Sequence, residues 1–301
     1  MSSADFQSNP DNFCYRHPDR QSFVLCQRCL RTICPECQTQ MPVGVICPEC
    51  LQAQAEARPA ASNVIRMPRR RRAVRVSDSR PLVTYGIAAV TGFVYLLQLI
   101  PGFGPLVQGS LLMFAPLLYP ELSGVFQPWR VLTVLLVHDG FWHVGLNMLA
   151  LWMLGRSLEP LLGHRRFLWL YLLSGLGGSV AITLFGFTTP VVGASGAIFG
   201  LFGALLVIGR HIGANITGIA VVLGINLVIT FLPVIGSLMG GTSMSPISWQ
   251  AHVGGLAVGA LVGLIYARTR AIRQQRVQAL LLAATAAGLV LLLLVPVFLY
   301  R

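Results

Sequence analysis

The sequence predicts an all-α membrane protein with several spans and a small polar domain at its N-terminal end. Hydrophobic residues make up 54% of the 301 positions and charged residues only 11%, whereas soluble domains carry about a quarter charged residues. From Pro81 onward, apolar segments follow one another, each near the roughly 20 residues that cross a bilayer. Because lipid offers the backbone no hydrogen-bond partner, these segments are expected to be helices.

Composition divides the chain into three regions, which we take as its domains. Residues 1–57 are polar and contain all seven cysteines, residues 58–80 form a linker rich in Pro, Ala and Arg, and residues 81–301 form the membrane domain. The segment between the first two spans is rich in Gly, Pro and aromatic residues, and we expect it to lie on or partly in the membrane. The predicted spans are 82–100, 143–161, 167–186, 195–210, 214–235, 250–267 and 279–299.

The arginines predict the orientation of these spans. Seven arginines between Arg66 and Arg80 precede the first span, which places the N-terminus in the cytoplasm. Alternation then puts on the same side Arg165, Arg166, Arg210, Arg268, Arg270, Arg273 and Arg276. It leaves the C-terminus outside, and only Arg130 and Arg301 do not follow the pattern. The chain has no lysine, which is typical of a GC-rich genome. We therefore expect a multi-pass protein of a bacterial plasma membrane that contacts membrane lipid.

Polar side chains begin three of the predicted spans. Such residues are unfavourable in the membrane and tend to mark function. The second span begins with His143 and Asn147, which share one helical face because they are four residues apart. The fourth begins with Ser195 and the sixth with His252. All three spans run from outside to inside, so the four side chains are expected at a similar depth, where they can converge.

Residue chemistry suggests a hydrolytic role for this group. A serine hydroxyl is a poor nucleophile unless a base takes its proton, and a neutral histidine is such a base near pH 7. Hydrolysis of an amide also requires donors for the developing oxyanion, which Asn147, His143 and the N–H group of Ser195 can supply. Because no acidic residue is placed to orient His252, we expect a Ser–His dyad rather than a triad.

Glycines predict close packing between the fourth and sixth spans. Gly196 and Gly200 lie on one face of the fourth span, and Gly255, Gly259 and Gly263 lie on one face of the sixth. Small residues at four-residue intervals let helix backbones approach closely in membranes.

With these motifs, residues 81–270 resemble the rhomboid family of intramembrane serine proteases. The resemblance implies a rhomboid-like core of six helices with one additional C-terminal helix. It also implies that catalysis needs no cofactor. The motifs that carry the resemblance are Trp129-Arg130, His138, His143-x-x-x-Asn147, Gly155-x-x-x-Glu159, Gly193-x-Ser195-Gly196, and Ala251-His252 followed by Gly255 and Gly259.

The resemblance also implies roles for these residues. Ser195 would be the nucleophile and His252 the general base, and Asn147 and His143 would line the oxyanion hole. The implied substrates are transmembrane helices of other proteins, cut near the outer membrane face. Structural support would come from Trp129, Arg130, His138, Glu159, Gly193, Gly196, Gly255 and Gly259.

Two other readings of the membrane domain are weighed against a protease. A catalytically silent protein of the rhomboid fold would bind membrane clients, but such relatives typically lack the serine or the histidine that this chain keeps. A transporter would be expected to show internal repeats, and the sequence shows none.

The polar domain carries eight candidate metal ligands, in four pairs with a two-residue gap. Cysteines confined to a cytosolic segment favour metal ligation over disulfides, and eight ligands suffice for two tetrahedral zinc ions. So small a segment is expected to need the metal in order to fold. The pairs are Cys14 and His17, Cys26 and Cys29, Cys34 and Cys37, and Cys47 and Cys50.

This spacing resembles a B-box-type zinc finger. The resemblance implies interleaved ligation, in which the first and third pairs hold one ion and the second and fourth hold the other. A sequential arrangement of the pairs stays open. A protein partner is favoured over a nucleic acid for this domain, since the adjacent arginine run is most simply a topology signal and a contact for anionic lipid.

Overall fold

The computed structural model describes residues 10–41, 43–57, 80–238 and 248–299, and divides the chain into two compact units, residues 1–73 and 74–301. Apart from Arg80, the predicted linker 58–80 lies outside the described residues.

The N-terminal unit consists of short elements built around its cysteines. Strands β1 and β2 pair antiparallel, as do β3 and β4. Five of the seven buried hydrophobic residues of its core are cysteines, and only Ile33 and Ile46 are aliphatic. So small an apolar core does not stabilise a domain by itself. The elements are η1 (Pro10–Asn12), β1 (Phe13–Cys14), β2 (His17–Gln21), η2 (Pro35–Cys37), β3 (Thr39–Gln40), β4 (Val45–Ile46) and α2 (Pro48–Glu56).

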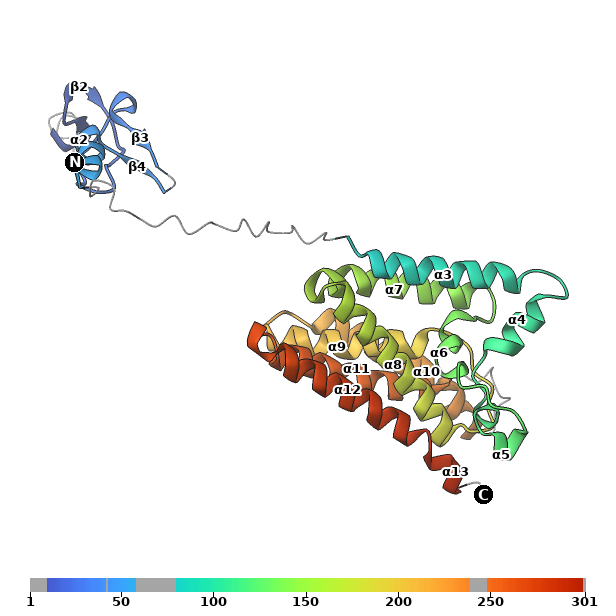
Figure 1. The fold of residues 1–301 in the computed structure, drawn as a ribbon. Helices are drawn as coiled ribbons and strands as arrows, with labels where there is room; N and C mark the ends of the chain where they lie inside the picture. Colours follow the sequence, from blue (N-terminus) through green and yellow to red (C-terminus); the bar gives the residue numbers. More distant parts are fainter. Residues whose placement is uncertain (1–9, 42, 58–79, 239–247, 300–301) are drawn as a thin grey trace. The chain divides into compact units, whose positions relative to one another are not determined.

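The regular elements of the C-terminal unit are all helices among its described residues. In its bundle, α3 and α7 lie side by side at one edge and α12 lies at the other (Figure 1). The elements are α3 (Leu82–Gln98), α4 (Gly104–Leu111), η3 (Ala115–Leu118), α5 (Pro120–Ser123), α6 (Arg130–Thr133), η4 (Val134–Leu136), α7 (Phe141–Leu162), α8 (His164–Phe185), α9 (Ser195–His211), α10 (Thr217–Leu238), α11 (Trp249–Arg268), η5 (Ile272–Gln274), α12 (Gln275–Leu292) and α13 (Val295–Leu299).

Six of the seven predicted spans each overlap one helix, and the seventh, 279–299, covers most of α12 and all of α13. Four helices of the described chain are long and apolar enough to cross a membrane: α8, α10, α11 and the stretch Gln275–Phe298. A fifth is added if Arg130–Leu136 and Phe141–Leu162, bent by 97° to one another, count as one span. Helices α3 and α9 have 17 residues each, which at about 1.5 Å per residue falls slightly short of a full crossing. The predicted polytopic, helical membrane fold is confirmed.

Helices α8, α9 and α11 form the centre of the bundle, where glycines bring the backbones together. A Cβ atom added to Gly255 would overlap the carbonyl oxygen of Gly196, and one added to Gly259 would overlap that of Gly200. One turn further along α11, a Cβ at Gly263 would come 2.7 Å from the Cα of Ala204. The predicted close approach of these two helices is therefore confirmed, and it fixes the main chains that carry Ser195 and His252.

Candidate functional site

Ser195 and His252 meet at the ends of the two glycine-packed helices. Ser195 is the first residue of α9, and His252 lies in the first turn of α11. Ser248 caps α11, because its hydroxyl oxygen accepts a hydrogen bond from the N–H group of Ala251 at 3.3 Å. The Nε2 atom of His252 is 2.8 Å from the Oγ atom of Ser195. This is hydrogen-bond distance between a nucleophile and the base that could activate it.

Two further side chains enclose the imidazole ring of His252. The ring of Phe199 is stacked on it, with centroids 4.1 Å apart and planes 9° from parallel. The Oγ1 atom of Thr230, on α10, is 2.7 Å from Nδ1 of His252. Sequence reasoning named neither residue. Phe199 follows Ser195 by four positions and so faces the same side of α9. This spacing can be read from the sequence and indicates that Phe199 lies near the site. Thr230 lies on another helix and has no motif around it.

The two histidines that precede and begin α7 contact the loop before Ser195. The N–H group of Ala194 donates to Nε2 of His138 at 3.3 Å, and His138 packs edge-on against His143 at 5.0 Å between centroids. A Cβ atom on Gly193 would come 2.7 Å from Nε2 of His143. Gly193 also has φ +116°, a conformation that favours glycine. The Gly193 position therefore requires glycine on both counts, and it leaves room for the His143 ring against the loop before Ser195.

Asn147 lies one turn after His143 and is buried. Its Nδ2 group donates to the carbonyl oxygen of His143 at 2.8 Å. A side-chain amide has two hydrogens on that nitrogen, so this bond uses one of them.

Trp129 and Arg130 fix the segment between α3 and α7. Arg130 is buried, and its guanidinium donates to the carbonyl oxygens of Leu112 and Gly109 at 2.6 and 2.7 Å and to Oε1 of Gln127 at 2.6 Å. The indole N–H of Trp129 donates to the carbonyl oxygen of Ser110 at 3.1 Å. Since Arg130 makes three bonds at once, it ties the end of α4 to the start of α6.

Glu159 lies at the opposite end of α7 and holds the start of α3. Its carboxylate accepts the N–H groups of Val83 and Thr84, both at 2.8 Å, and the hydroxyl of Thr84 at 2.6 Å. The first N–H groups of a helix have no partner within the helix, so this carboxylate satisfies two of them. His164 Nδ1 lies 2.6 Å from the same carboxylate.

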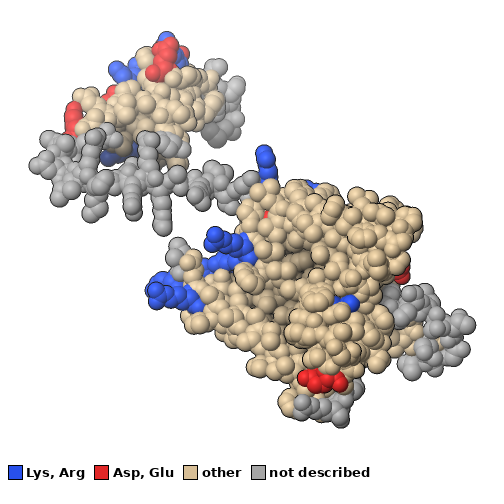
Figure 2. All heavy atoms as spheres, turned by 45° about the vertical axis from the view of Figure 1, so that its right-hand side comes forward, with Lys and Arg blue, Asp and Glu red and all other residues tan. Residues whose placement is uncertain are grey.

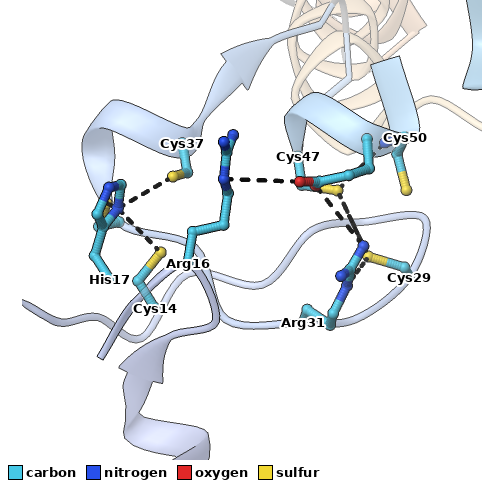
Figure 3. A network of polar contacts seen from close by, with 10 residues as sticks. Cys14, Arg16, His17, Cys29, Arg31, Cys37, Cys47 and Cys50 are labelled. Atoms are coloured by element: carbon cyan, nitrogen blue, oxygen red, sulfur yellow. Dashed lines mark hydrogen bonds and ion pairs between the residues drawn. The ribbon is translucent and has the colours of Figure 1, made fainter. Parts of the chain in front are cut away.

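In the N-terminal unit the eight candidate ligands form two groups. Within each group the ligand atoms lie within 4.8 Å of one another. The first and third pairs come together, as do the second and fourth, so the clustering is interleaved rather than sequential. Figure 3 shows His17 facing Cys14 and Cys37, with Arg31 beside Cys29 and Cys47. The groups are Cys14, His17, Cys34 and Cys37, and Cys26, Cys29, Cys47 and Cys50.

The spacing of these atoms fits tetrahedral zinc. With Zn–S bonds of about 2.3 Å and Zn–N bonds of about 2.0–2.1 Å, the edges of a tetrahedron are about 3.6 Å for S···N and about 3.8 Å for S···S. The Sγ atoms of Cys34 and Cys37 are each 3.4 Å from Nδ1 of His17, and that of Cys14 is 3.8 Å from it. In the second group, the Sγ atoms of Cys29 and Cys47 are 3.7 Å apart.

Each group also contains a thiol with a lowered pKa. Burial raises the pKa of Cys14, but hydrogen bonds from the backbone of Cys34, Arg16 and His17 outweigh it and bring the pKa to about 6. The pKa of Cys26 is likewise about 6, because backbone hydrogen bonds outweigh its burial. At neutral pH each group therefore contains a thiolate, the form that binds a metal.

Each group also contains one thiol whose pKa is raised. Burial and the neighbouring Cys14 and Cys34 raise the pKa of Cys37 to about 11. Contact with Cys47, together with burial, raises the pKa of Cys50 to about 12. Clustered thiols resist further ionisation until a cation balances their charge.

Comparison with known proteins gives the family of the helical unit. Residues 125–269 match the family model of the Rhomboid domain. Residues 125–269 form a rhomboid-type membrane domain. The matched residues run from the segment before Trp129 to the end of α11 and include Ser195 and His252. With its apolar helices, this rhomboid domain makes the chain an integral membrane protein.

Three curated relatives illustrate the similarity. "Rhomboid protease GluP" of Bacillus subtilis (strain 168) is 33% identical over 224 residues, which are 73% of this chain and 42% of the relative. "RHOMBOID-like protein 1" of Arabidopsis thaliana is 36% identical over 146 residues, 46% of this chain and 34% of the relative. "Rhomboid protein 1, mitochondrial" of Saccharomyces cerevisiae is 32% identical over 151 residues, which are 47% of this chain and 43% of the relative. The chain thus spans less than half the length of these relatives.

Proposed function

We propose that this protein is an intramembrane serine endopeptidase that cuts transmembrane helices of other membrane proteins near the outer membrane face. The observation that carries the proposal is the 2.8 Å contact between Nε2 of His252 and Oγ of Ser195 inside a rhomboid domain. The similarity to the Bacillus subtilis relative, which is named a rhomboid protease, supports it. The alternative, a silent protein that binds clients, has less support because this chain keeps both reacting side chains.

The reaction follows from these two residues. Nε2 of His252 takes the hydroxyl proton as Oγ of Ser195 attacks the carbonyl carbon of the scissile bond. The resulting imidazolium then gives that proton to the departing amine, which leaves an acyl-enzyme. Water repeats the sequence with His252 as base, releasing a carboxylic acid and restoring Ser195.

Three donors are available for the oxyanion of each tetrahedral intermediate. The N–H group of Ser195 begins α9 and belongs to the orphan donors of a helix start. The Asp139 N–H group donates to Nδ1 of His143 at 3.3 Å, so the neutral ring keeps its hydrogen on Nε2, the atom beside Gly193. Asn147 has its second amide hydrogen. Preorganised donors of this kind each contribute about 10²–10³ in rate.

The first experiment tests the dyad. The full-length wild type, Ser195→Ala and His252→Ala are reconstituted in liposomes with a generic single-span substrate, and cleavage products are measured. We expect cleavage by the wild type and none by either variant. A fluorophosphonate that labels activated serines should label the wild type and neither variant. Cleavage that survives both substitutions would contradict the mechanism, and a wild type that neither cleaves nor becomes labelled would support the silent alternative.

We also propose the orientation that the arginines predict, with the N-terminus in the cytoplasm and the C-terminus outside. Arg165 and Arg166 lie in the first turn of α8, Arg210 in the last turn of α9, and Arg268 in the last turn of α11. Arginines gather along one side of the helical unit in Figure 2. Basic residues concentrate on the cytoplasmic side of membrane proteins, which puts the ends of helices that carry Ser195 and His252 toward the outer face.

For the N-terminal unit we propose two structural zinc ions in a B-box-like arrangement. The tetrahedral edges, the lowered pKa of Cys14 and Cys26, and the core poor in aliphatic residues support this role. The side chain of Arg31 adds positive charge beside the second group, with its Nε 3.3 Å from Sγ of Cys29. We propose a protein rather than a nucleic acid as the partner of this unit.

A further inference from the structure

The Nδ1 atom of His252 faces a hydroxyl group that none of the sequence motifs includes. Oγ1 of Thr230 lies 2.7 Å from it. Thr230 is only 2% exposed, so bulk water does not compete for this contact. The same oxygen is 2.7 Å from the carbonyl oxygen of Asn226, one turn earlier in α10.

The hydrogens of this chain of contacts can be assigned from donor and acceptor chemistry. A carbonyl oxygen only accepts, and a threonine hydroxyl has a single hydrogen. Thr230 therefore donates that hydrogen to Asn226, and its oxygen accepts from an N–H group at Nδ1 of His252. A neutral imidazole carries one N–H group, so Nε2 is left without hydrogen, facing Oγ of Ser195 at 2.8 Å.

We infer that Thr230 is a positioning residue that holds His252 in the tautomer with its hydrogen on Nδ1. This inference rests on the proposed protease function. In the opposite tautomer, Nε2 would donate to Ser195 and could not take its proton. When Nε2 does take the proton, the Nδ1–H group of the imidazolium keeps its bond to Thr230.

The hydroxyl thus does the orienting work that a carboxylate does in a triad. A carboxylate at this depth would be a buried charge in the membrane, which is unfavourable. A hydroxyl bonded back to its own helix fixes the tautomer without adding charge.

The position of Thr230 on α10 supports a specific role. Among the described residues of α10, only Leu223 and Thr230 are buried. They are seven residues, about two turns, apart and so lie on one face. The back-bond of a threonine to the preceding turn forms on any face of a helix. On this face its oxygen also reaches His252.

The test uses the full-length protein in detergent, with ¹⁵N-labelled histidine. The imidazole signals of His252 are identified by their loss in His252→Ala, and show which nitrogen carries the hydrogen. We expect hydrogen on Nδ1 in the wild type and in Thr230→Ser. In Thr230→Val, which keeps the shape and removes the hydroxyl, we expect a tautomer mixture or hydrogen on Nε2.

Kinetics supply the second readout. The hydrogen bond to His252 is stronger when the ring is the imidazolium of the transition state than when it is neutral. Thr230→Val should therefore lower kcat about 10- to 100-fold and leave KM within about twofold. Thr230→Ser should restore kcat to within about threefold of the wild type. The matched control is Thr183→Val, because buried Thr183 makes the same back-bond, to Ser179 at 2.8 Å, without a histidine partner. Its kcat should be unchanged.

The outcomes separate this inference from the protease function. A wild type with hydrogen on Nε2 overturns the role of Thr230, even if Thr230→Val fails to fold. So does a Thr230→Val variant with unchanged tautomer and kcat. If the wild type shows no cleavage, the proposed function fails, while the histidine signals still decide the tautomer.

Discussion

The imidazole of His252 is contacted on three sides by residues of two other helices, α9 and α10. Ser195 of α9 is at Nε2, Thr230 of α10 is at Nδ1, and Phe199 covers one face of the ring. Two edges and one face are therefore fixed, and a ring so held can rotate little about its side-chain bonds. Catalytic groups held in a productive geometry need less reorganisation when the reaction occurs.

At this scale we predict the effect of removing the stacked ring. Phe199 is buried, 4% exposed, so Phe199→Ala should lower the free energy of unfolding by about 3–5 kcal/mol through lost packing and a cavity. The freed imidazole should also lower kcat, by up to about 10²-fold. Unfolding in denaturant and cleavage rates measure the two effects.

Phe199→Tyr serves as the control, because it keeps an aromatic ring and should retain most of the activity. If Phe199→Ala loses stability but keeps kcat, then the stack packs the helix without holding the base.

Among the elements, α9 and α11 owe their contact to main-chain atoms rather than to interlocking side chains. The carbonyl oxygens of Gly196 and Gly200 occupy the space where Cβ atoms of Gly255 and Gly259 would lie. This contact could be predicted from the sequence because glycines at four-residue intervals in a membrane helix indicate close packing against another helix. The rotation of α10 could not, since a helix apolar on nearly every side gives no period that shows which face turns inward. Thr230 was missed for that reason.

The same contact predicts the effect of one methyl group. Gly259→Ala should force α9 and α11 apart and lower the free energy of unfolding by about 1–3 kcal/mol, the usual range for overpacking, with a larger fall in cleavage. Thermal unfolding and cleavage rate are the measurements.

The matched control for this change is Gly288→Ala in α12, where a new Cβ atom would meet nothing within 4 Å. It should be neutral or slightly stabilising, because alanine favours helix over glycine. Equal effects of the two substitutions would show that helix propensity, not the close approach, governs the response.

The whole molecule combines two units whose stability has different sources. The rhomboid domain has a broad apolar core, whereas the small core of the N-terminal unit consists mostly of cysteines from two groups that could hold a metal ion. Motif order in the sequence was enough to predict the membrane fold and to name Ser195 and His252 as candidates. It could not decide how the four candidate ligand pairs group, since pairs with equal gaps look alike in sequence. The grouping becomes visible only when the fold brings Cys14 and His17 against Cys34 and Cys37.

At this scale we predict proton release on metal binding. Cys37 and Cys50, whose pKa values are raised to about 11 and 12, are thiols at pH 7 and must ionise to bind zinc. Adding zinc to the metal-free protein should therefore release protons, measured by calorimetry in buffers of different ionisation enthalpy.

The pH dependence has a definite sign. Cys14 and Cys26 have pKa values of about 6 in the folded unit, below the usual thiol value of about 8.5. In the metal-free unit, their contribution to stability is present above that usual value and is lost as pH falls through about 6. Because zinc binds the thiolates, zinc affinity should weaken as the pH falls below this value, and structure should be lost when the metal leaves. Circular dichroism with a zinc indicator follows both. Chelation at pH 7 that leaves the unit folded would contradict structural zinc.

The glycine contact between α9 and α11 also bears on how this protein tolerates sequence change. The distance between Ser195 and His252 is set by the contact between the main chains of α9 and α11. It therefore does not depend on which apolar side chains cover the lipid-facing surface. Substitutions among Leu, Ile, Val and Phe at the lipid-facing positions can therefore adapt the surface to bilayers of different composition. The distance between Oγ of Ser195 and Nε2 of His252 should stay the same.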